Sequence, residues 1–240
     1  MKRYLALFFI ASPLLFFTPL HAQMFSVGEV NRTTPIPNSY LRIGLAPTEF
    51  EFMGDRTANP NSVGLESSST AFVLHLDTPS LNLNLLLANS ITGLDDKSLL
   101  DLSLSLSNQF TLIRRPRISA GIPLQLSSVL TNANNDQDQE NFNQGSFAIG
   151  AGAFTSLRFA RRAGFVAEFI PSYGFSNSSG GFFGGSVFMM NGKAKFDIHN
   201  VIRGRSLSFG YDFMYRSFDV DDDFLDFDLT SHQITLGISF

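Results

Sequence analysis

The residues of this sequence whose types and spacing could do chemistry are charged side chains within stretches of alternating small and apolar residues. Asp212 and Arg216 lie four residues apart, and Lys193 and Lys195 two apart, so each pair shares one face of an extended strand. On the strand before that of the two lysines, Glu168 is expected to face the same way. Because buried charges must be paired, one interpretation is a salt-bridge network that fills a narrow interior. The other is a charged constriction that selects a small solute.

Histidine and aspartate residues give weaker candidates. His75 lies two residues before Asp77 and shares its strand face. The segment Asp219–Asp223 has aspartate at alternate positions, as a calcium loop does, although Phe224 stands where an EF-hand loop has glycine. Weak binding of Ca²⁺ or Mg²⁺ there is a hypothesis. The sequence contains no nucleophile elbow, HExxH, phosphate loop or paired-carboxylate motif, and it predicts no cofactor.

The composition excludes several classes of protein. The 240 residues include no cysteine, so we expect no disulfide, no lipidated cysteine and no thiolate metal site. The net charge of −4 does not favour nucleic-acid binding. Beyond the first twenty residues, no stretch is apolar enough for a membrane helix.

The elements that must position these residues are strands. About ten stretches alternate apolar with small or polar residues, and each is near the roughly 9–11 residues that cross a bilayer at a tilt. Near Pro47 the apolar parity changes, which predicts a bulge or a strand end. Eight strands are possible if the first pair is misread, and twelve if 23–39 or 62–66 contributes a strand. The predicted strands are 40–52, 69–77, 81–89, 99–112, 118–130, 146–159, 164–175, 183–197, 206–218 and 227–240.

The connections between these strands alternate in kind. One set is short and mostly basic, and the other is longer, polar and mostly acidic or uncharged. Short turns at one end and longer loops at the other are typical of an up-and-down membrane barrel. The short set is 78–79, 114–117, 160–163 and 200–205, and the longer set is 54–68, 92–97, 131–144, 177–181 and 220–225.

The two faces of the strands differ in a way that favours a membrane barrel over a soluble one. One face is almost entirely Leu, Ile and Phe, whereas a water-facing surface carries many Lys and Glu. A charge facing lipid at the bilayer midplane costs ~2–4 kcal/mol, so its near absence predicts that this face meets lipid. A soluble barrel with the apolar face inside is the alternative. The small, polar face carries the charges Arg42, Asp101, Glu168, Lys193, Lys195, Asp212 and Arg216.

The first residues predict export. Lys2 and Arg3 precede an apolar run, 4–20, which ends in the small residue Ala22. A charged start, a short apolar core and a small final residue are typical of a secretory signal peptide, which we place at residues 1–22. Residues 23–39 then form a polar lead-in in the periplasm, and 40–240 the barrel.

The last strand carries a family resemblance. Ile234, Leu236, Ile238 and Phe240 alternate with small or polar residues, and the chain stops on the aromatic ring. This resembles the closing strand of bacterial outer-membrane β-barrel proteins, in which such a strand is the assembly signal. The resemblance implies an all-β, transmembrane antiparallel up-and-down barrel in the outer membrane with both termini in the periplasm. Its implied partners are outer-membrane lipid, lipopolysaccharide and the barrel-assembly machinery, which would bind the last strand.

Two weaker resemblances concern enzymes. The segment 197–199 (DIH) resembles the Asp-x-His of omptin proteases, which are ten-stranded barrels, but their site is at the extracellular rim and this segment is expected at the periplasmic end. His232, near Ser231 and Asp228, resembles the rim residues of lipid A–modifying barrels, but it has the parity of the lipid-facing Ile234. We therefore expect no enzyme.

The function expected from the sequence is that of a non-enzymatic outer-membrane barrel, either structural or a narrow channel for small solutes. A surface binding or adhesion module acting through segments 131–144 and 54–68 is the alternative. A lipid-modifying or proteolytic barrel is the third hypothesis.

Overall fold

The computed structural model describes residues 39–52, 67–92, 97–135, 140–178, 185–220 and 226–240. The predicted signal peptide and nearly all of the lead-in lie outside them. In this part of the chain, no helix is long and apolar enough to span a membrane. The elements are β1 (Tyr40–Phe52), β2 (Ser67–Asp77), β3 (Leu81–Ala88), η2 (Ser90–Thr92), β4 (Lys97–Arg115), β5 (Ile118–Asn135), β6 (Glu140–Ala151), β7 (Ala153–Ala160), β8 (Ala163–Ser178), β9 (Gly185–Ile202), β10 (Arg205–Val220) and β11 (Phe227–Ser239).

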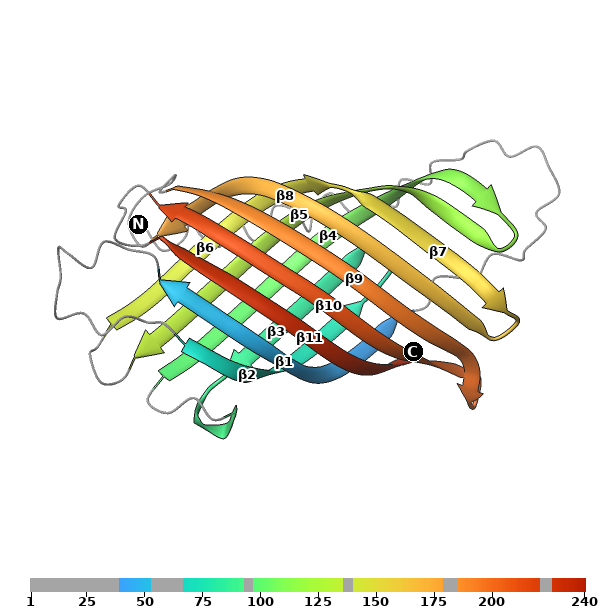
Figure 1. Cartoon of the computed structure of the whole chain (residues 1–240), viewed down its shortest axis with the longest axis horizontal. Helices are drawn as coiled ribbons and strands as arrows, with labels where there is room; N and C mark the ends of the chain where they lie inside the picture. The colour runs from blue at the N-terminus through green and yellow to red at the C-terminus, as the bar shows by residue number, and fades with distance from the viewer. Residues whose placement is uncertain (1–38, 53–66, 93–96, 136–139, 179–184, 221–225) are drawn as a thin grey trace, which may run out of the picture. The chain divides into compact units, whose positions relative to one another are not determined.

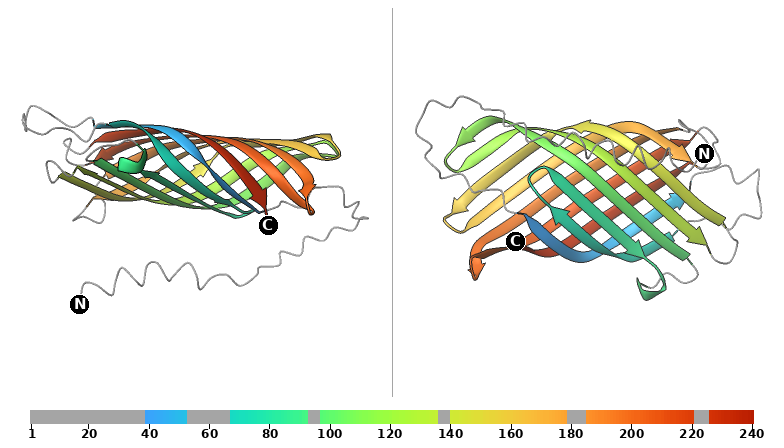
Figure 2. Two further views of the ribbon diagram at one scale, coloured as in Figure 1. Left: turned by 90° about the horizontal axis from the view of Figure 1, so that it is seen from below. Right: turned by 180° about the vertical axis from the view of Figure 1, so that it is seen from behind.

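Hydrogen bonds join the strands into a closed ring. Strands β1 to β5 and β8 to β11 each pair antiparallel with the next, β6 and β7 lie between β5 and β8, and β11 pairs with β1. Figures 1 and 2 show the tilted strands curling into a barrel. The prediction of an all-β, antiparallel up-and-down barrel of about ten strands is confirmed. Because β6 and β7 occupy one place in the ring, the described strands form a closed ring of ten.

The division between β6 and β7 has a local cause. Gly152 lies between them, opposite Pro123 of β5, and donates its N–H to the Pro123 carbonyl over 3.2 Å. Pro123 has no N–H to return the bond, so the ladder is interrupted there. The pairing with β8 keeps one register on both sides, from Gly150 with Ser172 to Ala153 with Phe169. The single strand predicted at 146–159 is therefore continuous in direction.

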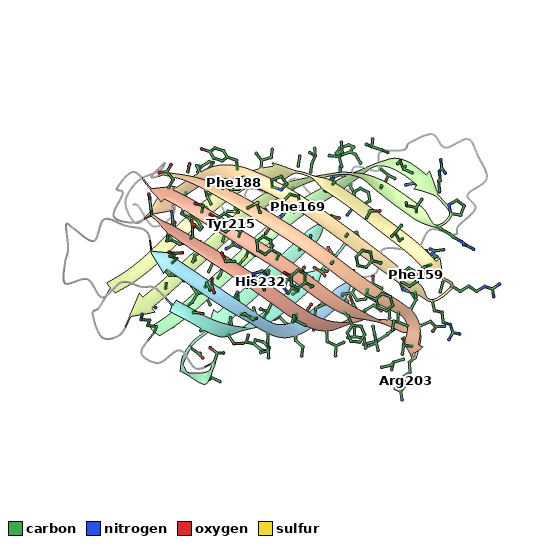
Figure 3. The ribbon with its side chains drawn as sticks, viewed as in Figure 1. Phe159, Phe169, Phe188, Arg203, Tyr215 and His232 are labelled. Atoms are coloured by element: carbon green, nitrogen blue, oxygen red, sulfur yellow. The ribbon has the colours of Figure 1, made fainter. Side chains whose placement is uncertain are left out.

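The outward face is the Leu, Ile and Phe face, as the sequence predicted. Ile149 is 64% exposed and Ile234 68%, whereas Gln233 and Thr235 beside Ile234 are buried. Figure 3 labels several of the outward side chains, among them Phe159, Phe169 and His232. The predicted soluble alternative, with these residues in a core, is thus wrong for the described residues.

The bulge or strand end predicted near Pro47 is wrong. Strand β1 runs without a register shift past Pro47, which lies opposite Thr70 of β2. Phe50 does not mark a new outward face; it points inward and is 2% exposed. The physical reason is that the lumen is apolar at this end, so an inward Phe has a core to join.

The two ends of the barrel differ. We call the end with the turns 78–80, 116–117, 161–162 and 203–204 the turn end, and the opposite one the far end. At the turn of β9 and β10, Arg203 (φ 49°) and Gly204 (φ 84°) both have the positive φ that tight two-residue hairpins require. Toward the far end the lumen holds an apolar cluster, formed by Ala46, Phe50, Ala71, Val73, Leu86, Ala88, Leu99, Val129, Ala133, Ala148, Val187, Met189, Met214, Phe218, Phe227 and Leu229.

Candidate functional site in the lumen

The polar part of the lumen is organised around Arg42 of β1, which is fully buried. Its Nε donates to Asp77 Oδ2 on β2 over 2.7 Å, and its Nη2 donates to Asp212 Oδ1 on β10 over 3.1 Å. Its Nη1 donates to Thr235 Oγ1 on β11 over 2.7 Å. One guanidinium therefore binds both neighbours of β1 and the next strand beyond, across the pair that closes the ring.

Two glycines make room for this arginine. A Cβ on Gly210 of β10 would lie 2.0 Å from Arg42 Nη1, and a Cβ on Gly237 of β11 would lie 2.3 Å from Arg42 Cγ. Both distances are far below contact, so any side chain there would displace Arg42. The inward glycines of the last two strands are therefore part of the site.

A histidine and two amides extend the network. His75 Nε2 lies 2.6 Å from Gln233 Oε1, and Asn84 Nδ2 donates to the same oxygen over 3.3 Å. His75 Nδ1 lies 3.5 Å from Arg42 Nη2. The pair His75 and Asp77, predicted from the sequence to share a face, therefore belongs to the Arg42 network.

A second ion pair crosses the lumen. Arg216 of β10 donates to Asp101 of β4, five places away in a ring of ten, so the two strands are opposite walls. Both side chains are buried, and Thr131 Oγ1 donates to the same Asp101 carboxylate over 2.7 Å. This ion pair therefore spans the lumen at that level.

The five charges singled out in the sequence all face the lumen, but they are divided among several partners. Asp212 contacts Arg42, whereas Arg216 contacts Asp101, so these two do not pair with each other. Lys193 Nζ lies 3.3 Å from Asp77, and Glu168 accepts from Gln109 over 3.1 Å. Lys195 Nζ lies 3.5 Å from Asp197 and 4.1 Å from the centre of the Tyr40 ring.

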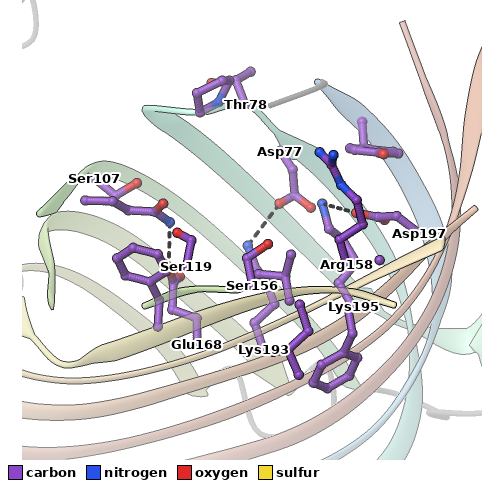
Figure 4. Close-up of a pocket in the computed structure, with 18 of the residues that line it drawn as sticks. Asp77, Thr78, Ser107, Ser119, Ser156, Arg158, Glu168, Lys193, Lys195 and Asp197 are labelled. Atoms are coloured by element: carbon purple, nitrogen blue, oxygen red, sulfur yellow. Dashed lines mark hydrogen bonds and ion pairs between the residues drawn. The ribbon is translucent and has the colours of Figure 1, made fainter. Parts of the chain in front are cut away.

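A cavity of about 420 Å³ opens at the turn end. Figure 4 shows Lys193 and Lys195 reaching into it, with Asp77, Asp197 and Glu168 on its walls. A smaller cavity of about 80 Å³ shares Asp77, Glu168 and Lys193 with it and extends among the polar lumen side chains to Gln233. The lumen is thus hollow and polar from the turn end and filled toward the far end.

Two groups of residues raised the enzyme hypotheses, Ser231 and His232 with Asp228, and Asp197 with His199. Ser231 is buried inside the barrel while His232 is exposed outside it, so the strand holds them on opposite faces. His232 Nδ1 lies 2.8 Å from the Tyr211 hydroxyl, and Asp228 accepts from Tyr215 over 2.9 Å. Asp197 and His199 both line the turn-end cavity. The geometry therefore does not bring Ser231 and His232 together.

The calcium hypothesis concerns residues 219–223, and 221–223 lie outside the described ranges. Within those ranges, no group of three His, Asp or Glu side chains could hold a metal ion. Of the predicted assembly residues, Ile234, Leu236 and Ile238 lie on the outward face of β11, next to β1, and the exposed Phe240 follows the end of the strand. Their recognition by an assembly machinery stays a prediction.

Comparisons with known proteins give distant similarities. No family model and no curated protein matches the sequence. Among solved structures, the chain resembles the outer membrane protease OmpT of Escherichia coli, with 10% identity, 85% of this chain and 96% of that one covered, and a TM-score of 0.39. It also resembles the attachment invasion locus protein Ail of Yersinia pestis (12%, 85% and 99%, TM-score 0.29) and the Pseudomonas putida toluene transporter TodX (8%, 85% and 70%, TM-score 0.28). These similarities are too distant to carry the activity of any of the three to this chain.

Proposed function

We propose that this chain is a non-enzymatic structural protein of the bacterial outer membrane, a barrel whose lumen is closed by its own side chains. The outward band of Leu, Ile and Phe around a ring without sheet edges supports a lipid surrounding, since both features meet the demands of a bilayer. With both termini periplasmic, as expected from the sequence, the turn end faces the periplasm.

The observation that carries the closed lumen is the bond between opposite walls. Arg216 reaches Asp101 across the ring, and the stacked rings of Phe218 and Phe227, 4.1 Å between centroids, belong to the apolar cluster toward the far end. Side chains that fill a narrow barrel, and an apolar constriction in particular, oppose the passage of water and ions. A structural barrel fits this interior better than a channel that is open at rest.

Conductance tests this proposal. In planar bilayers, the wild-type protein is expected to give no steady current above that of the protein-free membrane. The variant D101A/R216A/F218A/F227A removes the cross-lumen pair and two rings of the apolar cluster, and it is expected to conduct if it folds, as judged by its migration on a gel before and after boiling. Regular single-channel openings of the wild type would contradict the closed lumen and favour the narrow channel.

A further inference from the structure

We propose that the cavity at the turn end is a binding site for a small acidic solute that also carries hydroxyl groups, such as an acidic monosaccharide. A closed structural barrel needs no ligand, so this inference goes beyond the proposed function. It rests on unused donors and an unused acceptor in one cavity, on the hydroxyl groups of its walls and on the charge around its mouth.

The cavity offers ammonium donors that the protein does not use fully. An ammonium has three N–H donors. Among the described residues, Lys195 has only the Asp197 carboxylate at 3.5 Å and the Tyr40 ring face, and Lys193 has only Asp77 at 3.3 Å. Both distances exceed the ~2.7–2.9 Å of a well-formed charge-assisted hydrogen bond. Two cations that line one cavity with spare donors form an anion site.

The same cavity offers an acceptor without a donor. Asp197 is 6% exposed, and its Oδ1 is reached by no hydrogen-bond donor in the described part of the chain. A buried carboxylate oxygen without a partner is costly unless a ligand or water supplies a donor. A hydroxyl next to the acidic group of the ligand would supply it, because Lys195 and Asp197 are already neighbours.

The walls match a hydroxylated ligand in chemistry and in size. Ser107, Ser119, Ser156 and Asn82 contribute small polar groups, and Phe154 contributes an apolar surface. Ligand pockets typically measure roughly 300–1,000 Å³, so 420 Å³ suits a single sugar ring or a molecule of similar size.

The charge around the mouth selects the sign of the ligand. The segments 110–117, 157–163 and 198–206, which form or flank three of the four turns, contain arginines and no acidic residue. Of the three acidic side chains that line the cavity, Asp77 and Asp197 are buried and already face lysines. The third, Glu168, accepts a hydrogen bond from Gln109 over 3.1 Å. Clustered charge of one sign at a cleft raises the local concentration of ligands of the opposite sign. An anion is therefore favoured over a cation of equal size.

The experiment uses three sugars that share a ring and differ in charge. Glucuronate, glucose and glucosamine are titrated into the protein without its predicted signal peptide (residues 23–240) in detergent micelles at physiological salt, and binding is followed by calorimetry. Glucuronate is expected to bind at least about tenfold more tightly than glucose, because one additional charge-assisted hydrogen bond corresponds to about that factor. Glucosamine is expected to bind more weakly than glucose. Equal binding of the three, preferred binding of glucosamine, or no binding of glucuronate would overturn the proposal. A cavity filled by the protein's own lead-in would appear as absence of binding and would count against it.

Variants locate the site. Lys195→Met keeps the length of the side chain without the ammonium, and it is expected to weaken glucuronate binding about tenfold or more. Lys195→Arg, which keeps the charge, is expected to bind within a few-fold of wild type. Arg161→Met removes one exposed charge from the same end without touching the cavity, and it is the matched control, expected to change binding less than about twofold. Gel migration before and after boiling checks that each variant is folded. A folded Lys195→Met variant that binds glucuronate as tightly as wild type would overturn the assignment of Lys195 to the site.

Discussion

Replacing Arg42 with methionine removes the guanidinium and keeps a long unbranched side chain in the lumen. The structure shows how much charge this leaves uncompensated. Asp77 retains Lys193 at 3.3 Å, but Asp212 loses both of its contacts to Arg42. We therefore expect the cost of one unpaired buried charge, about 3–5 kcal/mol of unfolding free energy, rather than of two.

A second variant separates the charge from the packing. In R42M/D212N, an uncharged amide also replaces the carboxylate that has lost its partner. Replacing both members of a buried ion pair often changes the stability little. We expect the double variant to recover most of the loss. Arg205→Met, at an exposed position next to a turn, is the control and is expected to stay within about 0.5 kcal/mol of wild type.

Urea unfolding in lipid vesicles, followed by far-UV circular dichroism, measures these differences; the sequence has no tryptophan for an indole signal. An Arg42→Met variant within about 1 kcal/mol of wild type would refute the central place of Arg42. A double variant no more stable than the single one would show that packing, and not charge, decides the loss.

Three further outcomes are expected. Gly237→Ala places a Cβ 2.3 Å from Arg42 Cγ and should cost about 1–3 kcal/mol in the same unfolding assay, whereas Gly145→Ala, whose Cβ meets no atom closer than 3.6 Å, should cost less. Ile149→Lys puts a charge on the outward face and should lower the unfolding free energy in vesicles by ~2–4 kcal/mol, whereas Ile149→Leu should not. An Ile149→Lys variant as stable as wild type would argue against lipid at that position. Deletion of Phe240 should prevent assembly, seen as loss of the compact, heat-modifiable band in outer-membrane fractions. Normal assembly of this variant would contradict the predicted assembly signal.

The strands and their outward faces could be predicted because they depend on the period of two alone. The stretch Leu81–Ala88, for example, needs no partner for its alternation to be recognised. Strand ends were less accurate: β9 runs to Ile202, five residues beyond the predicted end, because pairing with β10 continues where the alternation is weak. Hydrogen bonds between backbones, which the sequence does not display, set those ends.

The partners of the lumen charges could not be predicted, because they depend on which walls face each other after the ring closes. Parity placed Arg216 and Asp101 inside, but only the ring of ten makes them opposite. A usable signal for Arg42 was present in the inward glycines Gly210 and Gly237. The apolar cluster could not be predicted, because an inward apolar residue such as Phe50, considered along its own strand alone, indicates a bulge or a strand end.

The measurement that tests the account most directly is a scan along β11 for contact with lipid. The sequence has no cysteine, so single cysteines at 231–236 can each carry a spin label without a background. In vesicles, the labels at His232, Ile234 and Leu236 are expected to be reached by oxygen dissolved in the bilayer, and those at Ser231, Gln233 and Thr235 to be shielded from it. Access of a water-soluble reagent to the first set, or no alternation at all, would contradict a barrel that faces lipid with its Leu, Ile and Phe side chains.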